Sequence, residues 1–304
     1  MQINSLSTSF ILTADIGGSH ITAAICHLES HSILTQSITR VAVDSKGPAE
    51  SILERWAGAF NQVLQKHVTA SVTGLSIAMP GPFDYENGIS YIKGLDKYES
   101  LYGMDIKRYL ADTLGIDHRI IRFRNDAEST IAGEVLSGAG KDHQRVMGIT
   151  LGTGLGSAYS ENGITQDLNL GSNPYRETIA DDYLSTRWFL KRHLELTGVT
   201  LIGGVKELAS LAYASEIARD IFIEFADNMG DFLSGPVAKY NPEVLILCGN
   251  IAKASEFFLP YLNEKLNSIN IKVAQLGENA PLIGAAALFD HLDLPASFNS
   301  VTKL

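Results

Sequence analysis

Thr13-Ala-Asp-Ile-Gly-Gly-Ser-His20 is the most informative stretch of this chain, because an apolar strand runs through an aspartate directly into a glycine pair. Two later stretches also end a strand in polar or small residues: Ile121-Arg-Phe-Arg-Asn-Asp-Ala-Glu128 and Ile149-Thr-Leu-Gly-Thr-Gly-Leu-Gly156. Glycine lets backbone N–H groups approach an anion, since no Cβ stands in the way. Each stretch alone is weak evidence. Their order, with an acidic pair between two glycine loops, predicts a site for phosphate transfer.

Length and composition predict a protein with a large core, arranged in two lobes. The chain has 304 residues, of which 45% are hydrophobic, so it can bury a large core. Its net charge of −10 and pI of about 5.3 argue against a surface that binds nucleic acid. The first nine residues do not resemble a signal peptide, and no apolar run reaches the roughly 18 residues of a membrane span. We therefore expect a cytoplasmic protein that contacts no membrane.

The two cysteines, Cys26 and Cys248, both lie in apolar runs typical of strands. Their number excludes a disulfide scaffold and a cysteine-rich zinc site. We expect two buried thiols that pack as small hydrophobic side chains.

Apolar strands alternate with amphipathic helices along the chain, which predicts an α/β fold. Residues 10–16 and 21–27 are expected to form a hairpin around Gly17-Gly18. Residues 145–151 and 157–160 repeat this pattern of strand, glycine turn and second strand, which suggests two lobes built on one plan. Further elements are predicted: a helix that begins near Pro48, a strand over 74–79, a helix over 127–136, a helix over 216–240 and a strand over 244–248.

Two glycine-rich stretches do not match the fingerprints of a P-loop or of a dinucleotide-binding fold. Gly138-Ala-Gly-Lys141 resembles the end of a P-loop, but Val135 replaces the first glycine and Asp142 replaces the hydroxyl residue. The loop Gly152-Thr-Gly-Leu-Gly156 has its third glycine one residue too early for a dinucleotide-binding fold, and a strand is expected after it.

Asn125-Asp126 has two interpretations. Asn125 followed by Glu128 fits a capping box at the start of a helix, which is a purely structural role. In the functional interpretation, Asp126 accepts a proton from a hydroxyl and Asn125 holds a neighbouring hydroxyl. Capping and catalysis are compatible, and the position of this pair between two glycine loops favours the functional interpretation.

Taken together, these motifs resemble the ROK group of bacterial sugar kinases and repressors, within the actin/hexokinase/Hsp70 ATPase superfamily. The resemblance covers nearly the whole chain. It rests on six stretches: Asp15-Ile-Gly-Gly-Ser19, Ala78-Met-Pro-Gly-Pro82, Asn125-Asp126, Thr150-Leu-Gly-Thr-Gly-Leu-Gly156, Asn241-Pro-Glu-Val-Leu-Ile-Leu-Cys-Gly249 and Pro281-Leu-Ile-Gly-Ala-Ala-Ala287. The chain begins almost directly at the first of them, which favours the kinase branch over the repressors, whose DNA-binding domain precedes it.

The chain departs from the family pattern in one segment. Asn169-Leu-Gly-Ser172 stands where family members usually carry Glu-Ile-Gly-His, and the zinc-binding cysteines that normally follow are absent. Asp181 falls at the position of a further family glutamate. The glutamate and histidine normally contact the sugar, so we expect poor affinity for glucose and a preference for another hexose or a derivative. Asp96, Lys97 and Tyr98 are candidates to compensate.

The resemblance implies an ATP-dependent hexose kinase that uses magnesium, binds no zinc and forms a homodimer. It implies a two-lobed actin-like ATPase (ribonuclease H-like) fold, with a mixed sheet in each lobe and the active site in the cleft between them. Residues 1–124 and 288–304 would form the smaller N-terminal lobe, and residues 125–287 the larger one.

The resemblance also implies roles for individual residues. Asp126 would be the catalytic base, and Gly81, Asn125, Asn169 and Asp181 would bind the sugar. Nine residues would bind ATP and its phosphates: Asp15, Gly17, Gly18, Ser19, Gly152, Thr153, Gly154, Gly156 and Gly249. Asp15 would also hold magnesium through water.

Two alternatives come from other functional classes. One is a catalytically weak or inactive sugar-binding sensor with the same fold, which intact phosphate loops argue against. The other is an actin-like kinase that acts on a carboxylate. It is disfavoured because Asn125-Asp126 directly follows a strand, as transfer to a hydroxyl requires.

Overall fold

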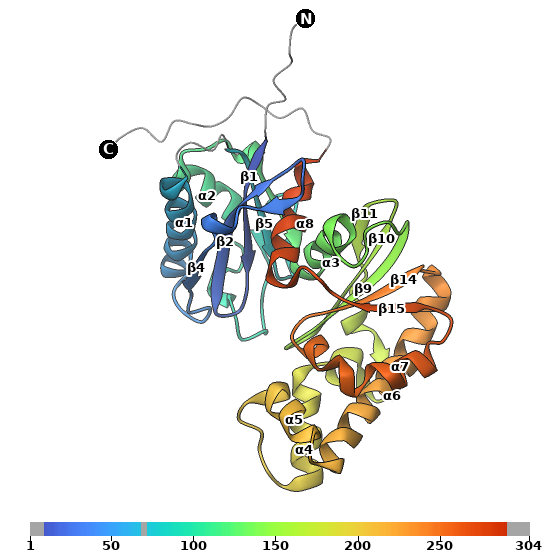
Figure 1. Ribbon diagram of the computed structural model, residues 1–304. Coiled ribbons are helices and arrows are strands. Elements are labelled where there is room, and N and C mark those ends of the chain that lie inside the picture. The colour runs from blue at the N-terminus through green and yellow to red at the C-terminus, as the bar shows by residue number, and fades with distance from the viewer. Residues whose placement is uncertain (1–8, 68–71, 291–304) are drawn as a thin grey trace, which may run out of the picture. The chain divides into compact units, whose positions relative to one another are not determined.

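The computed structural model describes residues 9–67 and 72–290, which form two compact units (Figure 1). The first unit holds the chain up to Gly133 and again from Glu278, and the second unit is Glu134–Gly277. Each unit contains one mixed five- or six-stranded sheet with helices packed on it. The predicted α/β fold with a mixed sheet in each lobe is therefore confirmed.

The first sheet has the strand order β3-β2-β1-β5-β8, and β4 pairs with β2 beside it. Its strands are β1 (Phe10–Ile16), β2 (His20–His27), β3 (Ser32–Ile33), β4 (Thr39–Ala42), β5 (Val72–Met79) and β8 (Ile121–Asn125). The strands β1 and β2 form the predicted antiparallel hairpin, whereas β1, β5 and β8 run parallel. Parallel strands end at the same edge of a sheet, so three chain turns meet there.

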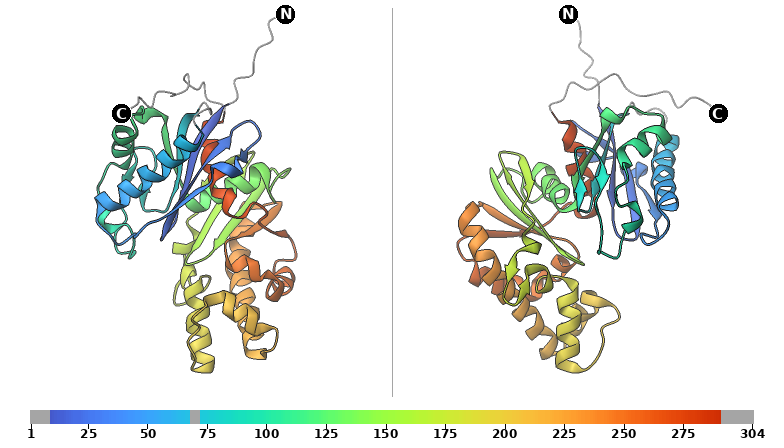
Figure 2. Two further views of the ribbon diagram at one scale, coloured as in Figure 1. Left: turned by 60° about the vertical axis from the view of Figure 1, so that its left-hand side comes forward. Right: turned by 180° about the vertical axis from the view of Figure 1, so that it is seen from behind.

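Helices cover both faces of the first sheet (Figures 1 and 2). They are α1 (Ala49–Lys66), α2 (Ile106–Leu114), α3 (Asp126–Ser137) and α8 (Ala280–Ala286), and a small hairpin joins β6 (Phe83–Asp84) to β7 (Ile89–Ser90). Leu12 of β1 packs in one core with Trp56 and Phe60 of α1. Thr13, the next residue along β1, donates to the carbonyl oxygen of Leu282 in α8 at 2.8 Å. Alternation along β1 thus places α1 and α8 on opposite faces.

Glycines allow α3 and α8 to approach closely. A Cβ added at Gly284 would lie 1.8 Å from the Ser129 carbonyl oxygen, and one added at Gly133 would lie 2.1 Å from that of Ala280. Since α8 packs on the first sheet and the first turns of α3 pack against α8, the units divide at 133/134 and 277/278. The boundaries expected from the sequence were 124/125 and 287/288. They place α3 and α8 in the larger lobe, residues 125–287.

The second sheet repeats the plan of the first, as the internal echo in the sequence predicted. Its order is β11-β10-β9-β14-β15, in which β9 and β10 form an antiparallel hairpin while β14 runs parallel to β9 and β15. The strands are β9 (Arg145–Leu151), β10 (Leu155–Glu161), β11 (Ile164–Asp167), β14 (Val244–Cys248) and β15 (Asn270–Val273).

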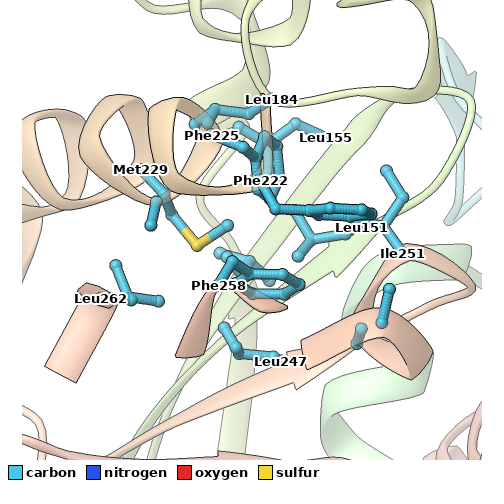
Figure 3. Close-up of a cluster of buried hydrophobic side chains, with 14 of the residues drawn as sticks. Leu151, Leu155, Leu184, Phe222, Phe225, Met229, Leu247, Ile251, Phe258 and Leu262 are labelled. Carbon is cyan, nitrogen blue, oxygen red and sulfur yellow. The ribbon is translucent and has the colours of Figure 1, made fainter. Parts of the chain in front are cut away.

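The core of the second unit is rich in aromatic side chains. Phe222, Phe225 and Phe258 pack with Leu151 and Leu247 of the sheet (Figure 3). The helices are α4 (Thr186–Thr197), α5 (Gly204–Ala212), α6 (Glu216–Tyr240) and α7 (Leu259–Lys265), and β12 (Pro174–Tyr175) pairs with β13 (Thr178–Ile179). The helix α6 has the predicted bounds, because Ser215 caps its start and left-handed Asn241, followed by a proline, ends it.

The two cysteines are buried in β2 and β14, and neither is in a disulfide. Burial raises the pKa of the Cys26 thiol to about 12, so both side chains pack as hydrophobic groups, as predicted. Among residues 9–67 and 72–290, no helix has the length and apolar character needed to cross a membrane.

Candidate active site

Three chain turns meet at one edge of the first sheet. In the register of the parallel strands, Asp15 of β1 lies beside Ala78 of β5, and Met79 of β5 lies beside Asn125 of β8. The carboxyl ends of these strands therefore bring Gly17-Gly18, Gly81 and Asn125-Asp126 to the same edge. Such an edge is where parallel sheets bind their ligands.

The carboxyl group of Asp15 has an unusual electrostatic environment. Burial of its carboxyl group, together with the nearby negative charges of Asp126 and Glu278, raises the pKa of Asp15 to about 7, and Arg40 partly opposes this shift. Arg40 itself pairs with Glu278 at 3.1 Å. The negative charges of Asp126 and Glu278 thus act on Asp15, and the Arg40 guanidinium group offsets part of their effect.

Asn125 caps α3, as the structural interpretation of its sequence context predicted. Its Oδ1 accepts a hydrogen bond from the Glu128 backbone N–H at 3.0 Å. Its Nδ2 donates to the Tyr85 hydroxyl at 3.2 Å, and that hydroxyl donates to the Met79 carbonyl oxygen at 3.2 Å. No sequence motif points to Tyr85, which lies 40 residues from Asn125.

Asp126 is the first residue of α3, and its Oδ1 accepts a hydrogen bond from the Ala127 N–H at 2.9 Å. The partial positive charge at a helix N-terminus stabilises an ionised carboxylate there. The negative charge of Asp126 contributes to the raised pKa of Asp15. The predicted base and the predicted magnesium position therefore lie at the same edge of the first sheet, at the ends of strands separated by β5.

The Gly17-Gly18 turn has room for a ligand. Gly17 donates its N–H to the His20 carbonyl oxygen at 3.0 Å, which closes the turn. A Cβ added at Gly18 would meet no atom within 4 Å, and Gly18 does not have a left-handed backbone conformation. Neither packing nor strain explains this glycine, whereas close approach of an anion would. The Ser19 hydroxyl lies 3.2 Å from Nδ1 of His20.

The second glycine loop, between β9 and β10, belongs to the other unit. Gly152 donates its N–H to the Gly154 carbonyl oxygen at 3.1 Å, and its own carbonyl oxygen accepts from the N–H and the hydroxyl of Thr186, both at 2.8 Å. A Cβ at Gly152 would meet nothing within 4 Å, and Thr153 is exposed. This loop too leaves open space where a ligand was predicted.

Two other glycines of the second unit have different surroundings. Gly156 lies within β10, opposite Thr150. Gly249 has a positive φ of 87°, and a Cβ there would lie 2.4 Å from the Leu151 carbonyl oxygen. Local backbone geometry is sufficient to explain Gly249.

The residues expected to replace the sugar-binding glutamate and histidine contact one another. The Ser172 hydroxyl donates to Oδ1 of Asn169 at 3.1 Å, and both side chains are exposed. Asp181 accepts the Leu155 backbone N–H with one carboxylate oxygen and pairs with Arg187 through the other. All three side chains therefore already have partners within the second unit.

Tyr98 is not placed to contact a sugar, in contrast to the expectation. Its side chain is fully buried, and its hydroxyl donates to the Gly17 carbonyl oxygen at 2.5 Å. Asp96 is exposed and pairs with Lys46, and Lys97 is half-buried.

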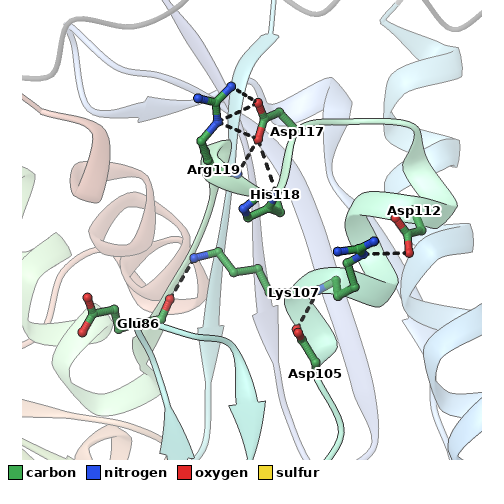
Figure 4. A network of polar contacts seen from close by, with 8 residues as sticks. Glu86, Asp105, Lys107, Asp112, Asp117, His118 and Arg119 are labelled. Atoms are coloured by element: carbon green, nitrogen blue, oxygen red, sulfur yellow. Dashed lines mark hydrogen bonds and ion pairs between the residues drawn. The ribbon is translucent and has the colours of Figure 1, made fainter.

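Asp117, His118 and Arg119, labelled in Figure 4, form a charged cluster at the end of β8 opposite to Asn125. Hydrogen bonds from Arg119 lower the pKa of Asp117 to about 2. Both residues are at the surface and directly precede β8, whereas Asn125 ends it. Asp117 and Arg119 pair with one another there.

Comparison with known proteins gives one family and a consistent fold. The model of the ROK family matches residues 11–172. The glucokinase of Thermotoga maritima is 26% identical, over 91% of this chain and 96% of the relative, and the N-acetyl-D-glucosamine kinase of Haemophilus influenzae is 23% identical, over 90% and 97%. Among solved structures, a ROK glucokinase from Streptomyces griseus in complex with glucose and AMPPNP superimposes with a TM-score of 0.75 at 22% identity, covering 92% of this chain and 98% of the other. The ROK hexokinase from Thermus thermophilus has a TM-score of 0.74 at 20% identity, covering 91% and 96%. At these identities the structures establish the fold alone.

Proposed function

This chain belongs to the ROK family of sugar kinases, and we propose that it transfers the γ-phosphoryl group of ATP to a hydroxyl of a hexose or hexose derivative. One observation carries the proposal. Asp126, at the start of α3, lies at the same sheet edge as Asp15 and the open Gly17-Gly18 turn. A carboxylate that can accept a hydroxyl proton and a turn that can accept a phosphate therefore occur together.

Asp126 would orient the attacking hydroxyl and accept its proton. Phosphoryl transfer proceeds through a loose transition state, which needs little proton abstraction until late. A carboxylate kept ionised at a helix N-terminus is therefore basic enough. Asn125 and Gly81 would hold neighbouring hydroxyls, and the Tyr85 hydroxyl fixes the orientation of the Asn125 amide.

Each of the two glycine loops would present backbone N–H groups to phosphate oxygens. Gly17, Gly18 and Ser19 belong to the first loop, and the residues from Gly152 to Gly156 form the second. Thr153 adds a hydroxyl that is exposed. Gly249 would line the nucleotide site only through its backbone.

The carboxyl groups around Asp15 fit a magnesium ion. Hard oxygen ligands suit Mg²⁺, which keeps several waters and binds through one or two carboxylates together with substrate phosphates. Within the described residues, no three His, Cys, Asp or Glu side chains converge to hold a metal, so Asp15 would hold the ion through water. The ion, when bound with ATP, neutralises phosphate charge.

The identity of the sugar is the finer part of the proposal. Neutral side chains form hydrogen bonds worth about 0.5–1.5 kcal/mol, against about 1.5–3 kcal/mol for charged ones. Asn169 and Ser172, which also bond to one another, would hold glucose less well than a glutamate and a histidine. We propose another hexose or a derivative as the preferred substrate, with affinity for glucose lower by a factor of about ten to a hundred.

The mutual bond of Asn169 and Ser172 also favours a second candidate, a catalytically weak or inactive sugar-binding protein. An assay of ATP consumption over a broad panel of sugars separates the two, with acetate included as a carboxylate acceptor. Turnover with one hexose well above the others supports the kinase. Sugar binding by calorimetry without turnover supports the second candidate, and turnover with acetate alone would contradict both.

A further inference from the structure

We propose that Asp181 is a positioning residue for the glycine loop Gly152–Leu155, and that it does not bind the sugar. The inference rests on the proposed function, because it assigns this loop to the phosphates of ATP. It differs from the role that the family resemblance implied for the same position.

Both carboxylate oxygens of Asp181 are used within the second unit. One oxygen accepts the backbone N–H of Leu155, and the other pairs with the guanidinium group of Arg187. A Cβ added at Gly154 would lie 3.0 Å from the first oxygen, so the carboxylate packs directly against the loop. These two contacts orient both carboxylate oxygens toward Leu155 and Arg187, so the side chain is held on the loop.

The other end of the loop is held by the same segment of chain. Asp181 lies in the 3-10 helix Ala180–Asp182, and Thr186 begins α4 a few residues later. The Thr186 N–H and hydroxyl both donate to the Gly152 carbonyl oxygen at 2.8 Å. One short segment therefore fixes the first and last residues of the loop.

This anchoring determines which backbone donors remain available. The Leu155 N–H is used by Asp181, and the Gly152 N–H is used by the Gly154 carbonyl oxygen. Within the part of the chain that the structure describes, the N–H groups of Thr153 and Gly154 have no such acceptor. Two adjacent free N–H groups on a fixed turn suit an anionic oxygen. Asp181 would thus act on ATP binding through the loop.

Kinetics distinguish this role from sugar binding. In Asp181→Ala, we expect the KM for ATP to rise about tenfold, the effect of about one lost hydrogen bond, while the dissociation constant of the sugar without nucleotide stays within twofold. Asp181→Asn keeps an acceptor for the Leu155 N–H, so it should restore most of the ATP affinity. The matched control is Asp182→Ala, since Asp182 is exposed and approaches Arg187 only to 3.9 Å. A tenfold weaker affinity for sugar with an unchanged KM for ATP would overturn the proposal.

A second measurement does not depend on turnover. Hydrogen exchange of the Leu155 amide should be faster in Asp181→Ala than in wild-type protein, and unchanged in Asp182→Ala. If no sugar is phosphorylated, the proposed function fails, but this measurement still tests the positioning role. Unchanged exchange at Leu155 would contradict that role. If Asp181→Ala does not fold, Thr186→Val gives the corresponding test at Gly152, with a raised KM for ATP as the supporting result and an unchanged one as the contrary result.

Discussion

The hydroxyl of Tyr98 donates a hydrogen bond to the carbonyl oxygen of Gly17, 81 residues away. Since a trans peptide unit is planar, its carbonyl and the following N–H point in opposite directions. The bond from Tyr98 therefore directs the Gly18 N–H away from the buried tyrosine. The first glycine turn is held in one orientation by a side chain outside its motif.

Tyr98→Phe should weaken ATP binding without unfolding the protein. The substitution keeps the buried ring, which packs edge-on against Trp56, and removes only the hydroxyl. We expect the free energy of unfolding to fall by about 0.5–1.5 kcal/mol and the KM for ATP to rise about three- to tenfold. Steady-state kinetics and thermal denaturation measure both. Tyr102→Phe, at an exposed tyrosine of the same segment, is the control, and an equal effect there would contradict the role of Tyr98.

Asp126→Asn should leave the fold and sugar binding nearly intact and lower kcat by about 10²–10⁴, the usual contribution of a general base. Asparagine still accepts the Ala127 N–H that Asp126 binds, so α3 should keep its start. Asp112→Asn, at an exposed carboxylate of α2, is the control. Phosphorylation by Asp126→Asn at the wild-type rate would show that Asp126 serves only the helix.

Asp15→Asn should stabilise the protein at high pH. The pKa of Asp15 is raised from 3.8 to about 7 in the folded state. As pH rises, the carboxyl group therefore ionises in the unfolded chain at a lower pH than in the folded protein. The free energy of unfolding therefore falls as pH rises from about 4 to 7, by up to about 1.4 kcal/mol per unit of pKa shift. Asparagine does not ionise, so the variant lacks this fall in the free energy of unfolding.

The Tm of Asp15→Asn should thus exceed that of wild-type protein more at pH 8 than at pH 4. Scanning fluorimetry over this range without nucleotide measures the difference. A Tm difference that is the same at both pH values would refute the electrostatic account of Asp15.

Gly284→Ala should destabilise the first unit, because the new Cβ would lie 1.8 Å from the Ser129 carbonyl oxygen. Backbone has to move to relieve this contact, at a cost of at least about 1–3 kcal/mol. Gly58→Ala is the matched control, since Gly58 lies in α1 with no atom within 4 Å of an added Cβ. It should stabilise the protein by about 0.5–1 kcal/mol. Chemical denaturation measures both, and equal effects would contradict close packing of α3 on α8.

The local elements of this protein are largely predictable from the sequence. The helix over 216–240 and the strand over 244–248 occur with the predicted bounds. The same is true of the cap that Asn125 forms on α3. Periodicity, capping residues and prolines act over a few residues, so these features can be recognised without knowing the fold.

The positions of the glycine loops and of Asn125-Asp126 at strand ends also follow from the sequence, because each motif includes the strand that precedes it. The neighbours that orient them do not. Tyr98 reaches Gly17, Tyr85 reaches Asn125, and Asp181 reaches Leu155 across 81, 40 and 26 residues. Such contacts depend on which strands pair and which segments pack against them. No local pattern encodes them, so only the folded chain shows that Tyr98 and Asp181 serve the loops.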